Sequence, residues 1–147
     1  IMSSRVGDRN PAHCTGVGKA LLAYLTDEEL ADRYPERRLA KFTDQTITDP
    51  EELKEALSLV RDRGYAIDQE EHELGVKCVA VPIFNHKGLA AAISVSGPVH
   101  RIDSHIEADA LIETLLNTAA EISDQMGWGQ GVDQLPPLER KGKMPVA

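Results

Sequence analysis

Two apolar runs separated by a polar turn constrain the fold of this chain more than any other feature of its sequence. The first run extends from Lys77 to Phe84, the turn covers residues 85–88, and the second run extends from Leu89 to Ser96. Strand-like runs joined by a short turn that contains glycine predict an antiparallel hairpin. Pro82 has no N–H to donate to a neighbouring strand, so it predicts an edge or a bulge at its position. A shorter run, Tyr65 to Asp68, predicts a third strand before the hairpin.

Helices are predicted before and after this strand-rich segment. Helix-forming residues run from Gly18 to Leu25, and a capping box at Thr26 starts a second short helix that extends to about Tyr34. A third helix is predicted between the Asp49-Pro50 start signal and Gly64. A long amphipathic helix is predicted from about Asp103 to Met126. This order of elements indicates an α+β fold, an antiparallel sheet with helices packed mainly on one face.

The domain organisation follows from length and from the composition of the C-terminal segment. A length of 147 residues suits one domain. We expect this domain to occupy residues 1–127, because the segment from Trp128 onward is rich in Gly, Pro and Lys without periodicity. Residues 128–147 are therefore expected to form a flexible tail. Three strands make a thin sheet, so we also expect its first strands to lie upstream of Ile1 or to come from a partner chain.

Charge and hydropathy exclude several classes of protein. The chain carries 16 basic and 24 acidic residues, a net charge of −8, and a domain this acidic is a poor binder of duplex DNA. No apolar run is long enough to span a bilayer, and no basic-then-apolar N-terminal pattern suggests a signal peptide. Without a secretory signal, Cys14 and Cys78 are expected to be reduced thiols in the cytoplasm.

The segment from His13 to Ala20 resembles a phosphate-binding loop but lacks two of its requirements. His13 stands where such a loop needs glycine, and Ala20 stands where it needs Ser or Thr to hold Mg²⁺. A smaller anion fits better, because Gly16 and Gly18 allow close approach and N–H groups at a helix start favour a carboxylate. A tight turn that only packs the helix is equally compatible with the local sequence.

The second strand of the hairpin has an unusually small face. Ala92, Ser94 and Ser96 alternate along the strand and therefore point to the same side. Small side chains leave room above the sheet, either for a closely packed helix, which is the more common case, or for a ligand. The serine hydroxyls could bind a carboxylate or carbonyl oxygen.

Asp68 and Cys78 are candidates for inward-facing polar groups. Asp68 ends a strand, and of the acidic run over residues 68–73 it is the residue expected to point inward. Cys78 could be a nucleophile, a metal ligand, a cavity-lining thiol or an inert core residue. His13 and His72 could join them in a zinc site, but no spacing typical of zinc ligands is present, so we predict no metal. No base is fixed beside Cys78, which leaves a cysteine hydrolase weakly supported.

Five segments resemble, in the same order, the C-terminal effector-binding domain of IclR-type transcriptional regulators. They are PAHCTGVGKALLA (11–23), TITD (46–49), RGYAID (63–68), EEHELGVKCVA (70–80) and AISVSGP (92–98). Each segment alone is a weak signal, but five in register between about Arg5 and Gly127 make a specific match.

The resemblance implies a GAF-like fold and a sensing function. In such regulators this domain binds a small organic acid or aromatic metabolite and controls a separate N-terminal winged helix-turn-helix. The resemblance therefore implies that DNA is bound only through a domain that is not in this chain. It also implies self-association as a dimer or tetramer, no enzymatic activity and no cofactor.

The resemblance also implies a pocket between the sheet and the loop at the helix start. The ligand would be bound by the backbone N–H groups of two residues and by four side chains: Gly16 and Val17, and Asp68, Cys78, Ser94 and Ser96. Leu21 and Leu22 are expected to supply an apolar wall. Two alternatives stay open: an enzyme on a GAF-like fold that uses Cys78, and an oligomerisation module with a collapsed pocket.

Overall fold

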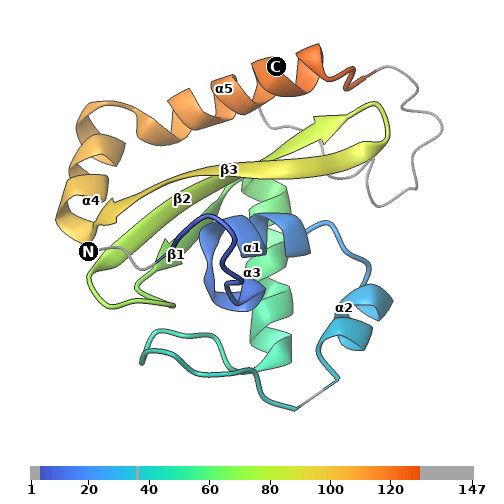
Figure 1. Cartoon of the computed structure of the whole chain (residues 1–147), viewed down its shortest axis with the longest axis vertical. Coiled ribbons are helices and arrows are strands. Elements are labelled where there is room, and N and C mark those ends of the chain that lie inside the picture. The colour runs from blue at the N-terminus through green and yellow to red at the C-terminus, as the bar shows by residue number, and fades with distance from the viewer. Residues whose placement is uncertain (1–3, 36, 130–147) are drawn as a thin grey trace.

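The described part of the chain is a three-stranded sheet between two layers of helices (Figure 1). The computed structural model describes residues 4–35 and 37–129. Its elements are the 3₁₀ turn η1 (Ala12–Cys14), α1 (Gly16–Leu22), α2 (Asp27–Arg33), α3 (Pro50–Arg63), β1 (Ala66–Gln69), β2 (Val76–Asn85), β3 (Gly88–Pro98), α4 (Val99–Ala108) and α5 (Leu111–Gln125). The α+β class and the antiparallel sheet are confirmed.

The sheet has the order β1-β2-β3, with both pairs antiparallel, so the predicted hairpin is formed by β2 and β3. The β1 pairing ends at Ala66 opposite Ala80. Pro82 therefore lies beyond the end of β1 and is paired only with Ala92 of β3 among the described residues. The register also shifts between Ile83 and Phe84. Pro82 thus lies where β2 has one free side and beside an irregularity, as its missing N–H predicts.

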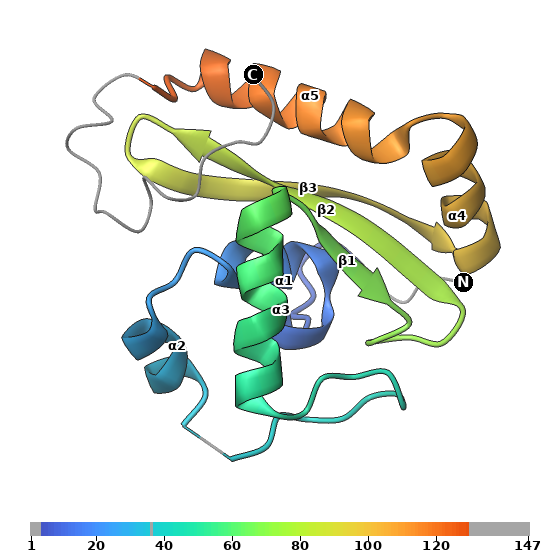
Figure 2. The ribbon, with the colours of Figure 1, turned by 180° about the vertical axis from the view of Figure 1, so that it is seen from behind.

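Helices cover both faces of the sheet, which corrects the expectation that they gather mainly on one face (Figure 2). Ala80 and Phe84 belong to the core that includes Leu53 and Leu57 of α3. The other face, with Val79 and its neighbours Val81 and Ile83, packs against Ile102 of α4 and against Leu115 and Ala119 of α5. The reason lies in β2, whose residues 78–84 are all buried. A strand that is apolar in both directions needs cover on both sides.

The single helix predicted from Asp103 to Met126 is wrong. Two helices stand there instead, α4 and α5, and the first begins directly after β3. Ala110 separates them with a left-handed backbone, at φ 50°. No glycine or proline marks this break, so the apolar periodicity runs through it. The break lies between two packing contacts, because Ile102 of α4 and Leu115 of α5 both pack on the same sheet face.

The predicted helix ends match the structure where local chemistry determines them. The Thr26 capping box is present, and the Asp49 side chain accepts from the N–H of Glu51 at the start of α3. Gly64 ends α3 in the left-handed conformation, at φ 85°.

Trp128 packs against the core, although the sequence places it at the start of the expected tail. Its ring centroid lies 4.7 Å from that of Phe84. The backbone N–H of Trp128 also donates to the Ser123 carbonyl at 2.9 Å. The ordered contacts therefore extend past the expected boundary at Gly127. Most of the expected tail, residues 130–147, lies outside the described residues.

Candidate ligand-binding site

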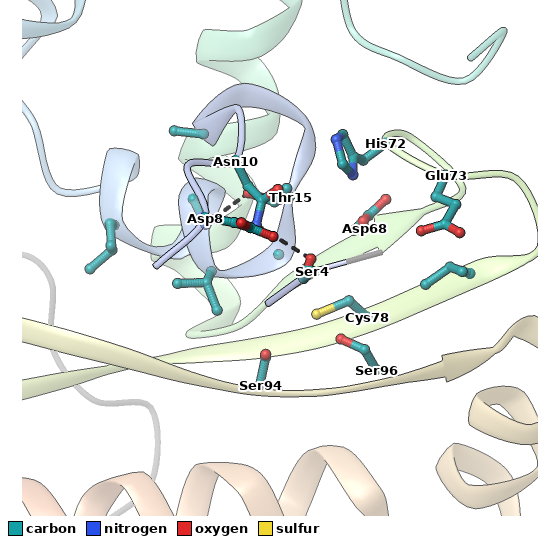
Figure 3. Close-up of a pocket in the computed structure, with 16 residues that line it drawn as sticks. Ser4, Asp8, Asn10, Thr15, Asp68, His72, Glu73, Cys78, Ser94 and Ser96 are labelled. Atoms are coloured by element: carbon teal, nitrogen blue, oxygen red, sulfur yellow. Dashed lines mark hydrogen bonds between the residues drawn. The ribbon is translucent and has the colours of Figure 1, made fainter. Parts of the chain in front are cut away.

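A cavity of about 550 Å³ lies between the start of α1, the sheet and the loop that connects β1 to β2 (Figure 3). Seven of the eight residues that the sequence indicates for a ligand site line it: Gly16, Val17, Leu21, Asp68, Cys78, Ser94 and Ser96. Leu22 does not. It is buried in the core that contains Leu53 and Leu57. Successive helical residues lie about 100° apart, so Leu21 and Leu22 do not face the same space.

Nine further residues line the cavity. The sequence indicated one of them, Gly18, as a position of close approach to an anion, and it did not indicate the other eight as ligand contacts: Ser4, Asp8, Asn10, Ala12, Thr15, His72, Glu73 and Val76. The positions of most of them in the sequence could have indicated them. Residues 4–12 directly precede the glycine loop, and residues 72–76 lie between Asp68 and Cys78.

The floor of the cavity is the small face of the sheet. Cys78 is paired with Ser96, and Ala80 with Ser94, so these side chains share one face. The same face also receives α1. A Cβ at Gly16 would stand 2.7 Å from Cys78 Sγ and 3.2 Å from Ala80 Cβ. Both interpretations of this small face therefore hold: α1 packs closely against part of it, and the cavity lies over another part.

The start of α1 is fixed by Thr15 and Gly18. The Thr15 hydroxyl donates to the Pro11 carbonyl at 2.9 Å and accepts from the Gly18 N–H at 3.3 Å. A Cβ at Gly18 would stand 2.3 Å from the Ala12 carbonyl oxygen. This close turn holds the backbone of Gly16 and Val17 against the cavity.

A buried ion pair holds the β1–β2 loop (residues 70–75) beside the cavity. Lys19 Nζ lies 2.8 and 2.7 Å from the two carboxylate oxygens of Glu71, and it also donates to the Ile67 carbonyl. Both side chains are almost fully buried, at 6% and 8% exposed. Glu71 therefore compensates the Lys19 charge. Sequence analysis did not predict this pair, whose members are 52 residues apart.

Threonine hydroxyls hold the same loop from its other side. Thr43 Oγ1 donates to the Glu70 carbonyl and Thr46 Oγ1 donates to the Glu71 carbonyl, both at 2.6 Å. Phe42 packs on His72, with ring centroids 5.2 Å apart. The loop that carries His72 and Glu73 is thus tied to the segment before α3.

Asp68 is an inward-facing acid, as the sequence predicts. Its side chain is buried and its Oδ1 accepts from the Glu71 N–H at 2.8 Å. Burial raises the pKa of Asp68 to about 6; the hydrogen bond from Glu71 N–H and the Lys19 and His72 charges oppose this rise, and the Glu71 charge adds to it. At neutral pH Asp68 is therefore mostly an ionised acid in a buried position.

Burial disfavours the thiolate form of both cysteines in this structure. Burial raises the pKa of Cys14 to about 12, and the nearby charges of Asp68 and Glu71 add to the rise. Burial also raises the pKa of Cys78, although hydrogen bonds with Ser96, Ser94 and the Gly16 N–H oppose it. Because the thiolate is the reactive form, these environments do not favour a cysteine-dependent reaction.

The residues considered for a zinc site are not brought together as one. His13 Nε2 lies 2.7 Å from the Ala40 carbonyl oxygen, while the His72 ring packs at a tilt against Phe42 at the cavity. Within residues 4–35 and 37–129, no group of three or more His, Cys, Asp or Glu side chains is arranged to hold a metal ion.

None of the helices in this described part has the length and apolar character needed to cross a bilayer.

The amino-acid sequence matches one family of known proteins. The family model described as "Bacterial transcriptional regulator IclR C-terminal" matches residues 1–124. The HTH-type transcriptional regulator BhcR of Paracoccus denitrificans (strain Pd 1222) is 46% identical over 118 residues, which are 80% of this chain and 42% of BhcR. The chain therefore spans less than half the length of this curated relative.

Solved structures agree with the sequence match. The C-terminal domain of the Escherichia coli regulator KdgR superposes with a TM-score of 0.73 and 37% identity, over 83% of this chain and 74% of that one. A double mutant of the inducer binding domain of PobR from Acinetobacter, in complex with 3-hydroxybenzoic acid, gives a TM-score of 0.72 and 36% identity. That match covers 81% of this chain and 69% of the PobR chain.

Proposed function

This chain belongs to the IclR family of transcriptional regulators, whose C-terminal domain it matches, and we propose that it senses a small organic acid bound in the cavity of about 550 Å³. One observation carries the proposal: polar groups from three separate elements converge on that cavity. Gly16 comes from α1, Asp68 from β1, and Ser94 with Ser96 from β3. The matched relatives and structural neighbours are transcriptional regulators rather than enzymes, which favours sensing over catalysis.

The ligand's carboxylate is proposed to lie over the sheet floor. There it would accept from the hydroxyls of Ser94 and Ser96 and from the N–H groups of Gly16 and Val17. Asp68 would accept from a hydroxyl of the ligand or from a water molecule. Leu21 would supply apolar contact. The double mutant of the PobR inducer binding domain holds 3-hydroxybenzoic acid, an acid with a hydroxyl, which supports this class of ligand.

Control of DNA binding is proposed to work through a separate N-terminal winged helix-turn-helix. A net charge of −8 makes this chain itself a poor binder of DNA phosphates. A ligand can shift a dimer or tetramer equilibrium only through its different affinity for the two states. A hydrogen bond connects the β1–β2 loop, which lines the cavity, to α4. The Val99 N–H at the start of α4 donates to the Gly75 carbonyl at the end of this loop, at 3.0 Å. A regulator of this kind would act in the cytoplasm.

The proposal is tested by the melting temperature of the chain in a panel of small organic acids. A ligand at 100 times its dissociation constant adds about 2.7 kcal/mol of stability, which is a shift of a few degrees for a domain of this size. Ser94→Ala should remove the shift. Ser104→Ala, an exposed serine on α4, is the matched control and should keep it. A folded chain that responds to no acid would instead support the oligomerisation module with a collapsed pocket.

A further inference from the structure

The segment TITD (46–49) is the one of the five matched segments that the candidate site does not use. Its four residues all belong to the described part of the chain, and none of them lines the cavity. Asp49, the last of them, caps α3. Thr46, the first, is a polar residue that is only 8% exposed. A buried hydroxyl needs hydrogen-bond partners, so the role of Thr46 lies in its contacts within the protein.

The Thr46 hydroxyl joins two backbone segments. Its Oγ1 accepts from the N–H groups of Phe42 and Thr43, at 3.0 and 2.9 Å. It donates to the Glu71 carbonyl at 2.6 Å, across 25 positions of sequence. A hydroxyl has one proton to donate and two lone pairs that accept, so these three bonds use it fully. Thr46 therefore ties the turn over residues 42–46 to the β1–β2 loop.

Glu71 connects this restraint to Asp68. Its N–H donates to Asp68 Oδ1 at 2.8 Å, so the residue whose carbonyl Thr46 holds is also the donor to the buried acid. The Glu71 side chain is held as well, because Lys19 Nζ bonds both of its oxygens and Oε2 also accepts from Gln69 N–H at 3.0 Å. Glu71 is thus fixed at its carbonyl, its amide and its carboxylate.

Asp68 is where this set of contacts meets the ligand cavity (Figure 3). Thr46, Glu71 and Lys19 are not among the described residues that line the cavity. An aspartate side chain turns about two bonds, and the hydrogen bond from Glu71 N–H selects one orientation of the Asp68 carboxylate. A group that is already held in its binding orientation loses less conformational freedom when a ligand binds, so the affinity is higher.

We propose that Thr46 is a positioning residue of the ligand site: its hydroxyl fixes the Glu71 backbone, and Glu71 N–H in turn holds the Asp68 carboxylate in its orientation at the cavity. This inference rests on the proposed function, since it concerns the same cavity. The hydroxyl of Thr46 is required for this role and its methyl group is not. Serine at this position should therefore replace threonine, and valine should not.

The amide proton of Glu71 reports on this arrangement without any ligand. An N–H that donates to a carboxylate makes a stronger hydrogen bond when the carboxylate is ionised, so its NMR resonance follows the titration of Asp68. We expect this pH-dependent shift in the unaltered chain and its loss in Asp68→Asn. Thr46→Val keeps the shape of the side chain without the hydroxyl and should also lose the shift. Thr46→Ser should retain it.

Thr48→Val is the matched control within the same segment. Thr48 Oγ1 accepts from Arg38 at 3.2 Å in an exposed position, so the variant should keep the Glu71 amide shift. It should also keep the protection of this amide against hydrogen exchange, which Thr46→Val should lower about tenfold, the effect of one lost hydrogen bond. A Glu71 amide shift that persists in Thr46→Val would overturn the inference.

Hydrogen exchange of the unaltered chain decides the question if Thr46→Val does not fold. The N–H groups of Thr43 and Glu71 should then open as one cooperative unit, because the Thr46 hydroxyl joins their two segments. Opening of one of these amides without the other would overturn the inference.

Binding measurements separate this inference from the proposed function. Glyoxylate, pyruvate and 3-hydroxybenzoate are the probes, and melting shifts measure their binding. A probe that binds the unaltered chain should bind Thr46→Val about tenfold more weakly and Thr46→Ser within about twofold. Equal binding by Thr46→Val would overturn the inference and leave the sensor function intact. If the folded chain binds none of these acids or of the wider panel, the proposed function fails, and the Glu71 amide shift still shows whether Thr46 holds Asp68.

Discussion

Gly16 lies so close to Cys78 that a Cβ at residue 16 would stand 2.7 Å from the Cys78 sulfur. This contact is where the first turn of α1 meets the sheet floor. Because α1 approaches so closely here, the backbone of Gly16 and Val17 borders the same cavity as Ser94 and Ser96. The glycine is thus needed for the shape of the site, and its φ is not in the left-handed region.

Gly16→Val should abolish ligand binding while the domain stays folded. The added side chain meets Cys78 and Ala80 in a buried position, and forcing α1 away from the sheet costs about 1–3 kcal/mol. Binding is measured by calorimetry and folding by circular dichroism. Gly97→Ala is the control, because its Cβ would meet Ile102 at an ordinary 3.4 Å. Intact binding by the valine variant would disprove the proposed position of the ligand.

A double-mutant cycle tests the same contact without any ligand. Gly16→Ala should destabilise the chain less when Cys78 is also replaced by alanine, since the sulfur that obstructs the new Cβ is then absent. The expected coupling is about 1 kcal/mol in urea unfolding. Additive effects of the two changes would show that α1 relieves the contact by moving instead.

The buried pair of Lys19 and Glu71 should be strongly coupled. Lys19→Met or Glu71→Gln alone leaves one charge buried without its partner, which costs about 3–5 kcal/mol. The double variant should cost much less than the sum, because no charge is then left unpaired. Lys54→Met is the control: Lys54 pairs with Glu51 at 2.9 Å on the surface of α3, and its loss should not change the urea midpoint measurably. Additive losses in the buried pair would contradict this interpretation.

Local signals predicted much of this fold because they need only neighbouring residues. The Thr26 capping box, the Asp49 cap and the left-handed Gly64 each depend on a few positions of sequence. The break at Ala110 does not: it lies between α4 and α5, which pack separately on the sheet, and nothing in the local sequence requires it. The helices on the second face of the sheet were missed for a related reason. The apolar run in β2 was used to predict a strand, but not to predict that both faces of this strand are covered by helices.

In the candidate site, too, local features were predicted from the sequence and long-range contacts were not. Ser94 and Ser96 were indicated by alternation along one strand, and Asp68 by its place at a strand end, both local features. The ion pair of Lys19 and Glu71 joins residues 52 positions apart, so only the folded arrangement reveals it. Leu22 was misplaced because two successive leucines look alike in sequence but face different directions on a helix.

Asp68 should make the chain less stable as the pH rises from about 4 to about 7. Its pKa is about 6 in the folded chain against a usual 3.8, so the folded state holds this proton more tightly than the unfolded state. The resulting stability is fully present below the unfolded pKa and is lost as pH rises through the folded pKa. The loss is about 2–3 kcal/mol by pH 7.5.

Asp68→Asn isolates this contribution. The variant should be more stable than the unaltered chain at pH 7.5 by about 2–3 kcal/mol and equally stable at pH 3.5, since the asparagine cannot ionise. Urea unfolding at several pH values measures the difference. Asp32→Asn, on the exposed side of α2, should show no such gain. A variant that is less stable at both pH values would mean that Asp68 is held by more donors than Glu71 N–H.

The cysteines should react slowly in the folded chain, which tests the enzyme alternative directly. A pKa of about 12 for Cys14 against a usual 9.0 leaves about a thousandfold less thiolate at neutral pH, and the pKa of Cys78 is raised in the same direction. Iodoacetamide labelling at pH 7.5, followed by peptide mass spectrometry, should modify both residues far more slowly than in urea. A bound acid should slow Cys78 further, because this thiol lines the cavity while Cys14 does not. If Cys78 instead reacts faster in the folded chain than in urea, its environment activates the thiolate. Cys78 would then be interpreted as a nucleophile and not as a cavity-lining thiol.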